Sequence, residues 1–466
     1  MPNTITSSLA EQIEVHEPER LKPLLDPAIA YLINNYPQTL FELVAQQGSP
    51  LNLVWPHAFQ INAAALQNVL RQYGVRHAIF YGAKANKSQS LLGAATTSGI
   101  GVDVSSIHEL DAALRAGMPA ERLCATGPAK TAVFHRALVL HGSLICVDSL
   151  EEFGHLKAVL QSIPAPVKAR VLLRYRPQSC PASRFGMGAD ELLQCLQHLT
   201  EHSGVFNFEG FHFHLGGYGY ANRVQAFREL TGFVDAAREM GLNPGMIDIG
   251  GGLPVRYVEP QAYAYFLQND NIPSNYYNHT VPESFYPYGS SLTACQWLAL
   301  FLEADHSPGQ SIANYLKAQN IILALEPGRS LVDQAAISLF RITRIKQLTH
   351  NKAVIFVEGS SFSACETWFS SEYLVDPILI STKNTPRMPM PMPSYIAGHS
   401  CLDDDVLTHR LINFNTTPQA GDLLIYANTA GYQMDLLENE FHRHPLPRRM
   451  MATCYTEGNY TFSPDY

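Results

Sequence analysis

The chain of 466 residues has a globular composition, 46% hydrophobic and 16% charged, and is long enough for two domains. A formal charge of −9 argues against a nucleic-acid-binding surface, which needs clustered lysine and arginine. The eight cysteines lie far apart without a CxxC pair, so neither a zinc ribbon nor a disulfide framework is expected, and no metal is predicted.

The start of the chain, residues 1–20, is polar and acidic and has the features of neither a signal peptide nor a transit peptide. No apolar run approaches the roughly 20 residues that a membrane span requires. We therefore expect a cytoplasmic protein that acts on neither a membrane nor a nucleic acid.

Short apolar runs alternate with amphipathic stretches between residues 57 and 340. The expected strands are His77–Tyr81, Gly101–Val104, Leu144–Val147, Val171–Tyr175, Gly210–Leu215, Met246–Ile249 and Ile321–Leu325. The expected helices include Ser106–Ala116, Gln225–Met240 and Ser311–Ala318. Repeated strand–helix units predict parallel strands with crossover helices. Seven such strands, together with an eighth that the pattern does not reveal, indicate a (β/α)8 barrel. An open doubly wound sheet is the alternative.

A separate β domain is expected for residues 341–466, because the helical period ends after Ile342. The strand-like runs Ala353–Val357 and Leu423–Tyr426 and the Pro-rich turns Pro386–Pro393 lie in this region. Residues 1–56 are expected to pack with the β domain, which leaves 57–340 to the barrel. The composition of the long segment Val255–Gly309 fits a surface excursion and a substrate lid equally well.

Lys84 follows an apolar strand directly, in the segment IFYGAKANKS. At a barrel mouth its stem would lie in a low dielectric, which lowers a lysine pKa and favours Schiff-base chemistry. Taken alone, such a lysine is more often a solvated strand end. The segments described next support the interpretation of Lys84 as a Schiff-base lysine.

Two histidines occupy alternate positions in GFHFHLGGYG, so His212 and His214 point to one face of a strand. Such a pair can bind a metal, stack on a flat aromatic cofactor or serve as hydrogen-bonded core residues. The sequence offers no convincing set of further metal ligands. Stacking is therefore favoured for one of the two rings.

Two later loops are suited to a phosphate. Gly250, Gly251 and Gly252 follow a strand in IDIGGGLP, where backbone N–H groups can approach an anion without side-chain obstruction. The segment ALEPGRSLV places Glu326 and Arg329 past another late strand, where barrels frequently bind phosphate. Together the two loops predict a site for a phosphate monoester.

Eight segments in this order resemble the fold-type III pyridoxal-phosphate-dependent enzymes of the ornithine/diaminopimelate/arginine decarboxylase family. They are YGAKAN, GVDVSS-IHEL, SRFGM, FHFHLGG, DIGGGLP, EPGRS, GHSCLDDDVL and GDLLIYANTAGYQ, from about Phe80 to the C-terminus. The resemblance implies an alanine racemase-like barrel with a C-terminal β-barrel or β-sandwich domain. It also implies a decarboxylase that binds pyridoxal 5'-phosphate and releases CO2 from Cα of an amino acid or amino-acid derivative. The alternatives are a racemase on the same fold and a non-catalytic, regulatory relative.

The resemblance implies catalytic roles for four residues. Lys84 would carry the cofactor as a Schiff base (the internal aldimine), and His214 would stack on its ring. Glu326 would keep the pyridine nitrogen protonated, which makes the ring a stronger electron sink. Alanine racemases of the same fold have an arginine at this position, so a glutamate there favours decarboxylation over racemisation. Cys401 would reprotonate Cα across the interface of a homodimer with shared active sites. The other implied cofactor-binding positions are Asp103, Arg174, Gly217, Gly250, Gly251, Gly252, Gly328, Arg329 and Tyr432.

The chain also departs from the family. Gly217 stands where a serine usually binds the phosphate, so cofactor retention is expected to be modestly weaker. Leu402 stands where an acid usually meets the distal ammonium of the substrate, so ornithine, lysine and diaminopimelate are doubtful substrates. Asp403 or Asp404 can replace that acid if the loop register slips, and Asp405 matches a family aspartate further along.

A longer, neutral or acidic distal group is therefore expected on the amino-acid substrate. The aromatic residues of the long segment would close over it: Tyr276, Tyr277, Phe285, Tyr286 and Tyr288.

Overall fold

A computed structural model describes residues 13–348, 352–364, 371–382, 392–456 and 458–465. The chain divides into two compact units. The barrel unit contains residues 60–254 and 292–331, and the β unit contains residues 1–59, 255–291 and 332–466.

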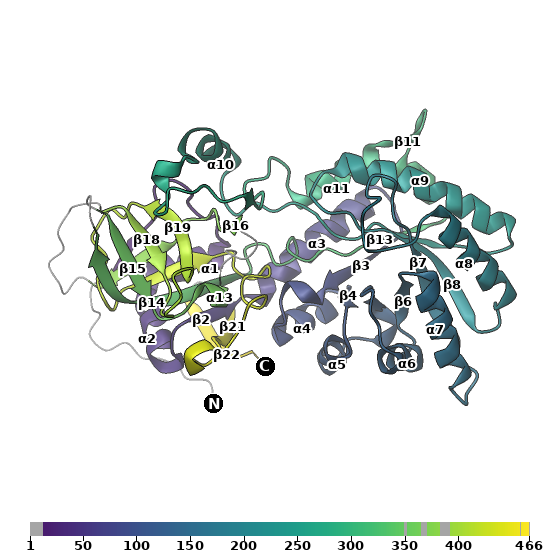
Figure 1. The fold of residues 1–466 in the computed structure, drawn as a ribbon, viewed down its shortest axis with the longest axis horizontal. Helices are drawn as coiled ribbons and strands as arrows, with labels where there is room; N and C mark the ends of the chain where they lie inside the picture. The colour runs from purple at the N-terminus through teal and green to yellow at the C-terminus, as the bar shows by residue number, and fades with distance from the viewer. Residues whose placement is uncertain (1–12, 349–351, 365–370, 383–391, 457, 466) are drawn as a thin grey trace. The chain divides into compact units, whose positions relative to one another are not determined.

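Eight parallel strands close a barrel in the barrel unit (Figure 1). They are β3 (His77–Gly82), β4 (Gly101–Val104), β5 (Leu123–Ala125), β6 (Leu144–Val147), β7 (Ala169–Arg174), β8 (Phe206–His212), β9 (Met246–Asp248) and β13 (Ile322–Leu325). The strands follow one another in chain order, and β13 closes the ring against β3. This closed ring confirms the expected (β/α)8 barrel and excludes the open doubly wound sheet.

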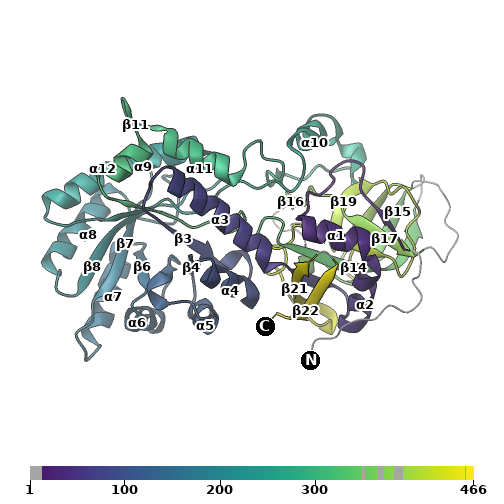
Figure 2. The ribbon, with the colours of Figure 1, turned by 180° about the vertical axis from the view of Figure 1, so that it is seen from behind.

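Helices separate the strands along the chain, as parallel pairing requires. They are α4 (Gln89–Thr97), α5 (Ile107–Arg115), α6 (Ala132–His141), α7 (Leu150–Gln161), α8 (Ala189–Glu201), α9 (Tyr220–Glu239), α11 (Ala294–Glu303) and α12 (Ile312–Ala318). Figure 2 shows α9, α11 and α12 side by side on the outside of the barrel. The helix α3 (Pro56–Gln72) precedes β3.

The strand that the sequence pattern missed is β5, which has only three residues. Two other strands approach so closely that only glycine fits between them. Gly210 of β8 has φ +150°, and a Cβ atom there would lie 1.9 Å from the carbonyl oxygen of Met246 on β9. The seam between β8 and β9 therefore requires a residue without a side chain.

The β unit is built on a ten-stranded sheet. Its strands are β1 (Ile13–His16), β2 (Leu51–Val54), β14 (Ala336–Gln347), β15 (Ala353–Val357), β17 (Ile378–Thr382), β18 (Ser394–Ala397), β19 (Val406–Ile412), β20 (Leu423–Ala427), β21 (Arg448–Thr456) and β22 (Asn459–Pro464). The first half of the long strand β14 pairs with β2 and β20, and its second half pairs with β15. The expected sheet-rich C-terminal region is confirmed, although residues 386–391 of its Pro-rich turn lie outside the described residues.

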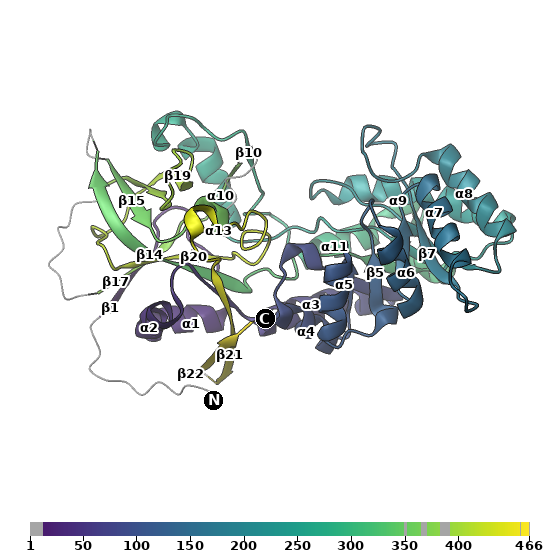
Figure 3. The same ribbon diagram turned by 60° about the horizontal axis from the view of Figure 1, so that its bottom comes forward.

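The start of the chain contributes two strands and two helices to this unit. β1 pairs with β17, and β2 pairs with β14 and β21. The helices α1 (Pro27–Asn35) and α2 (Pro37–Gln47) contact each other, and α2 contacts β1 and β14 (Figure 3). Asp26 begins α1 by accepting a hydrogen bond from the N–H of Ala28, with Pro27 at the first helical position.

Residues 255–291, which the sequence pattern counted with the barrel, belong instead to the β unit. The segment carries α10 (Pro260–Tyr265) and the short strand β10 (Ser284–Phe285), which pairs with β16 (Ser371–Glu372). Its apolar side chains enter the main core of the unit together with Phe340, Tyr373 and Tyr426. Burial of these side chains is the physical reason for the different boundary.

This packing also argues against the expected closure over the substrate. Tyr276 and Tyr288 are fully buried, and Phe285 and Tyr286 pack against the core of the β unit. Tyr277 stacks on Tyr395 with ring centroids 4.2 Å apart. Tyr276 and Tyr288 cannot cover a ligand without leaving the core, whereas a lid role for the other three residues stays a prediction.

Among the described residues, the seven cysteines form no disulfide. In the described part of the chain no helix combines the length and apolarity needed to cross a membrane.

Candidate active site

A cavity of about 580 Å³ lies at the carboxyl ends of the barrel strands. Lys84, Arg174, His212, His214 and Glu326 are among the residues that line it. They follow or end four different strands, β3, β7, β8 and β13. Barrel enzymes place their chemistry at this end, so the cavity is the candidate active site.

Lys84 lies in a short 3-10 turn, Ala83–Ala85, directly after β3. Its Nζ is 3.9 Å from Oδ2 of Asp103, whose other oxygen accepts a hydrogen bond of 2.6 Å from Thr126. The Lys84 side chain is 44% exposed. The low-dielectric surroundings expected for its stem stay a prediction.

Asp103 lies beneath Lys84 on β4 and is 1% exposed. Burial and the nearby Glu326 raise the pKa of its carboxyl group to about 7, although Lys84 acts in the opposite direction. The carboxyl group thus retains a proton to a far higher pH than an exposed aspartate does.

The raised pKa of Asp103 predicts a pH dependence of stability. Folded protein binds more protons than unfolded protein between pH 4 and pH 7, so this contribution is complete below about pH 4 and is lost as the pH rises through about 7. Asp103→Asn should abolish this loss, on the order of 2 kcal/mol between pH 5 and pH 8.

Urea unfolding of the cofactor-free protein at the two pH values measures the effect. Asp111→Asn is the matched control, because Asp111 is 61% exposed. An equal pH dependence in wild-type and Asp103→Asn protein would contradict the assignment.

Glu326 follows β13 and meets both histidines of the HxH pair. Its Oε1 lies 3.2 Å from Nε2 of His212, and its Oε2 lies 3.6 Å from Nδ1 of His214. Burial raises the pKa of Glu326, but the neighbouring imidazoles, His212 foremost, more than offset this and hold it well below its usual value. Glu326 is therefore an ionised carboxylate inside the barrel.

The His214 ring is held by a glycine of the next loop. Its Nδ1 accepts a hydrogen bond of 3.2 Å from the N–H of Gly251, which leaves the ring proton on Nε2 when the ring is neutral. Burial lowers the pKa of both His212 and His214, which favours neutral rings. A flat, neutral ring with a fixed orientation at the cavity wall is suited to stacking on an aromatic group.

Asp248 adds a third carboxyl group to the barrel interior. One of its oxygens accepts a hydrogen bond of 2.8 Å from the N–H of Gly250. Burial and the charge of Glu326 raise its pKa well above the usual value. The raised pKa values of Asp103 and Asp248 and the lowered pKa of Glu326 concentrate the negative charge of these carboxyl groups on Glu326.

Two groups of side chains in the described residues have donor atoms spaced for a metal ion. One is buried and consists of Cys124, Asp248 and Glu326. Burial raises the pKa of the Cys124 thiol well above its usual value. This opposes formation of the thiolate that a metal would need.

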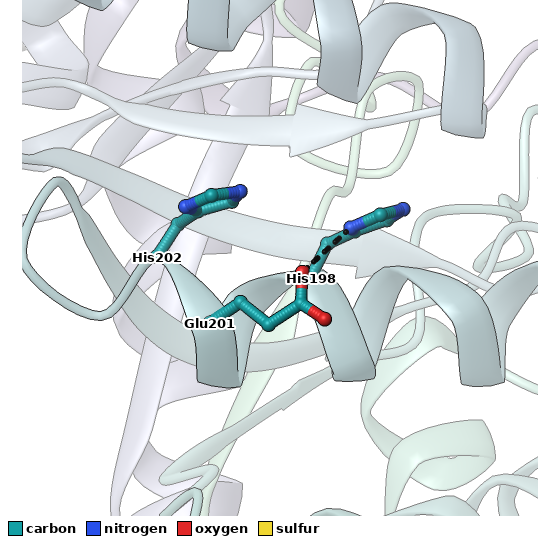
Figure 4. A group of neighbouring side chains, drawn as sticks. All are labelled: His198, Glu201 and His202. Carbon is teal, nitrogen blue, oxygen red and sulfur yellow. Dashed lines mark hydrogen bonds and ion pairs between the residues drawn. The ribbon is translucent and has the colours of Figure 1, made fainter.

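The other group is His198, Glu201 and His202, at the end of α8 on the surface (Figure 4). It precedes β8, so it lies at the amino ends of the strands rather than at the cavity. Nζ of Lys157 is 2.6 Å from Nε2 of His202 and occupies one of the ligand positions.

The glycine triplet after β9 is required by contacts within the protein. A Cβ atom at Gly250 would lie 2.6 Å from Nδ1 of His214, and one at Gly251 would lie 2.6 Å from the carbonyl oxygen of Glu326. A Cβ atom at Gly252 would lie 2.3 Å from Nη2 of Arg223. The loop thus packs closely against His214, Glu326 and Arg223, which its sequence alone did not indicate.

Arg174 at the end of β7 is fixed by residues that the sequence reasoning missed. Its Nη1 donates to Oδ1 of Asp148 at 2.9 Å, and the N–H of Asp148 donates to Glu152 at 2.7 Å. Glu152 also accepts a hydrogen bond of 2.7 Å from Lys130, whose side chain is fully buried. The one available signal was the position of Asp148, an acid directly after the strand Leu144–Val147.

The remaining expected residues divide between the units. Gly328 and Arg329 follow Glu326 in the barrel unit, where Arg329 is buried. Cys401 and Tyr432 belong to the β unit, where Cys401 is exposed and Tyr432 has φ +74°. Their part in the site stays a prediction.

The family model for the pyridoxal binding domain of pyridoxal-dependent decarboxylases matches residues 60–276. The diaminopimelate decarboxylase of Zymomonas mobilis is 24% identical over 88% of this chain and 89% of its own length. The chain belongs to the fold-type III pyridoxal-phosphate-dependent decarboxylase family. The cofactor is therefore pyridoxal phosphate.

Further relatives and solved structures match nearly the whole chain. The uncharacterized protein y4yA of Sinorhizobium fredii is 52% identical over 96% of both chains. A diaminopimelate decarboxylase of M. jannaschii, solved with L-lysine, has the same fold with a TM-score of 0.69 and 18% identity, covering 91% of each chain. A lysine/ornithine decarboxylase of Vibrio vulnificus, solved with putrescine, has a TM-score of 0.67 and 18% identity, covering 92% of this chain and 99% of its own.

The barrel residues fit the cofactor of this decarboxylase family. Oε1 of Glu326 is buried 3.2 Å from Nε2 of His212, without the geometry of a hydrogen bond, so it can still accept one from a protonated pyridine nitrogen. The amine of Lys84 lines the same cavity. The N–H groups of Gly216 and Gly252 donate to no group that the structure describes. The aldehyde of the cofactor thus has a suitable partner in Lys84, its ring nitrogen has one in Glu326, and its phosphate has one in the N–H groups of Gly216 and Gly252.

Proposed function

We propose that the chain is a carboxy-lyase that removes the α-carboxylate of an amino acid or amino-acid derivative as CO2. The supporting observation is the buried carboxylate of Glu326, which lies beside His212 and lines the same cavity as Lys84. When bound, pyridoxal phosphate withdraws electrons from Cα of the amino acid. A carboxylate opposite the ring nitrogen strengthens that withdrawal, which favours loss of CO2 over simple proton exchange.

Each residue then has a distinct task. Lys84 would hold the cofactor through its amine, and the His214 ring would stack on the cofactor ring. Glu326 keeps the ring nitrogen protonated, and Asp103 and Arg174 complete the polar wall. The phosphate is bound by Gly250, Gly251, Gly252, Gly328, Arg329 and Tyr432, with Gly217 in place of the usual serine.

Cys401 is proposed to supply the proton that Cα receives after CO2 leaves. Its exposure suits a residue that completes the site of a second copy of the chain, as family dimers arrange it. The active unit is then a homodimer with two shared sites.

The surroundings of Cys401 support a substrate without a distal ammonium. Leu402 is 45% exposed and cannot pair with a cation. Asp405 is buried, and its carboxylate accepts hydrogen bonds from the N–H groups of Ser361 at 2.7 Å and Ser400 at 3.0 Å. Asp405 thus holds the loop, whereas Asp403 and Asp404, which follow Leu402 in the chain, are exposed.

The cavity itself supports an acidic distal group. The guanidinium groups of Arg174 and Arg184 lie 4.7 Å and 4.3 Å from the centre of the Phe185 ring. Arg174 is paired with Asp148, whereas Arg184 has no carboxylate partner among the described residues. Arg184 lines the cavity and can therefore meet a carboxylate at the far end of a long substrate.

Steady-state kinetics test this specificity. Ornithine, lysine and meso-diaminopimelate are expected to give a kcat/KM below about 10⁴ M⁻¹s⁻¹, and an amino acid with a distal carboxylate should exceed it. Leu402→Asp should raise kcat/KM for the three amino acids with a distal ammonium. Arg184→Gln should raise KM for the acidic substrate alone. A kcat/KM of about 10⁴ M⁻¹s⁻¹ or more on any of the three would contradict the specificity.

The reaction itself is tested by CO2 release. Purified protein loaded with pyridoxal phosphate should release labelled CO2 from at least one carboxyl-labelled amino acid in a panel that includes citryl and other acylated diamino acids. Proton exchange at Cα without CO2 release would favour a racemase. Cofactor binding with neither reaction across the panel would favour a non-catalytic relative.

A further inference from the structure

Arg223 is a buried cation to which the proposed function assigns no task. It lies in the first turns of α9, and its side chain is fully buried. Burial lowers the pKa of its guanidinium group to about 10, so the group stays charged at neutral pH. No carboxylate pairs with it among the residues that the structure describes. Because an unpaired buried charge costs several kcal/mol, its surroundings must compensate it.

Backbone carbonyl groups supply most of the hydrogen bonds to Arg223, and Oδ1 of Asn222 accepts one more at 3.2 Å. Both of its terminal nitrogens donate to the loop after β8: to the oxygens of Leu215 and Gly217 at 2.7 Å, Gly219 at 3.1 Å and Gly216 at 3.3 Å. Nη2 also lies 3.5 Å from the carbonyl oxygen of Gly251 in the loop after β9. One side chain therefore joins the two glycine loops of the site.

These hydrogen bonds fix the direction of three N–H groups. In a trans peptide the C=O and the N–H point in opposite directions. The carbonyls of Leu215, Gly216 and Gly251 point at Arg223, so the N–H groups of Gly216, Gly217 and Gly252 point away from it. None of these three N–H groups donates to a group that the structure describes.

Trp297 holds the same loop from outside. Its indole Nε1 donates to the carbonyl oxygen of Tyr218 at 2.8 Å, and its ring lies 6.0 Å from the Arg223 guanidinium. Gly217 has φ +73°, a conformation that L side chains rarely adopt, and a Cβ atom there would meet nothing within 4 Å. The loop thus keeps an open, side-chain-free space where the family serine would stand.

We infer that Arg223 is a positioning residue for the phosphate of the cofactor. It turns three N–H groups of the two glycine loops toward one anion, and the anion in turn offsets its buried positive charge. Arg223 thereby replaces the hydroxyl group that the chain lacks at Gly217. This inference rests on the proposed function, because the anion is the phosphate of pyridoxal phosphate.

Comparison of two ligands that differ only in the phosphate tests the inference. Dissociation constants of pyridoxal phosphate and of pyridoxal are measured by equilibrium dialysis for cofactor-free wild-type, Arg223→Lys and Arg223→Gln proteins. Arg223→Gln removes the charge, and Arg223→Lys keeps it with fewer donors. Arg228→Gln is the control, because Arg228 is on the same helix but exposed and bound to the carbonyl of Asp305.

Arg223→Gln should bind pyridoxal phosphate about tenfold or more weakly, a loss of about 1.4 kcal/mol, and Arg223→Lys should fall in between. Pyridoxal should bind to all four proteins within about twofold, because a change of that size lies under 0.5 kcal/mol. Equal weakening of both ligands would overturn the inference, as would unchanged binding of pyridoxal phosphate. Failure of the wild-type protein to bind pyridoxal phosphate would instead overturn the proposed function.

A measurement on cofactor-free wild-type protein covers the case in which the variants do not fold. Inorganic phosphate should raise its unfolding temperature relative to chloride at equal ionic strength, because it occupies the same N–H groups. No rise at saturating phosphate would overturn the inference.

Discussion

Replacement of Lys84 by alanine is expected to give a folded protein that neither absorbs visible light with pyridoxal phosphate nor releases CO2. The amine of Lys84 lines the cavity, whereas Lys130 is fully buried and bound to Glu152 and to the carbonyl of Cys146. The rate should fall by about 10³-fold or more, which corresponds to roughly 4 kcal/mol in the barrier.

Visible absorbance, CO2 release and far-ultraviolet circular dichroism measure these effects together. Lys87→Ala is the matched control, because Lys87 is an exposed lysine three residues further along the chain. Retention of the visible band in Lys84→Ala, or its loss in Lys87→Ala, would contradict the role of Lys84.

Mixing two inactive variants should restore part of the activity. If Cys401 of one subunit completes the site that contains Lys84 of the other, Lys84→Ala and Cys401→Ala are each inactive as homodimers. Their heterodimer has one intact site. After full exchange of equal amounts, half of the dimers are mixed, so about a quarter of the wild-type activity should return.

Subunit exchange is verified by native mass spectrometry on differently tagged chains. Mixtures of Lys84→Ala with Lys84→Ala serve as the control and should stay inactive. Absence of recovery after demonstrated exchange would mean that the two residues do not form shared sites.

The barrel was predictable because its strands and helices repeat with a clear period. Seven of the eight strands have apolar runs that the pattern detects, whereas β5 has three residues and no measurable period. The assignment of residues 255–291 to the β unit was not predictable. Tyrosine-rich segments suit a lid or a core equally well, and only the burial of Tyr276 and Tyr288 decides between them.

The candidate site was predictable where its residues follow strands directly. Lys84, His214 and Glu326 each come within two residues of a strand end, and the barrel brings such ends together. Site residues that lie on helices were not predicted from the positions of the strand ends. Arg223 on α9 and Glu152 on α7 reach the site by hydrogen bonds to the backbone of the loops just before their own helices, and the strand pattern gives no sign of these contacts.

Peptide mapping after borohydride reduction tests the central claim most directly. Reduction fixes the bound cofactor on the lysine that carries it, and trypsin no longer cleaves after that lysine. One labelled peptide is expected, residues 77–87, with an uncleaved bond after Lys84. A label on Lys87 or Lys130, or no label on protein that has bound pyridoxal phosphate, would contradict it.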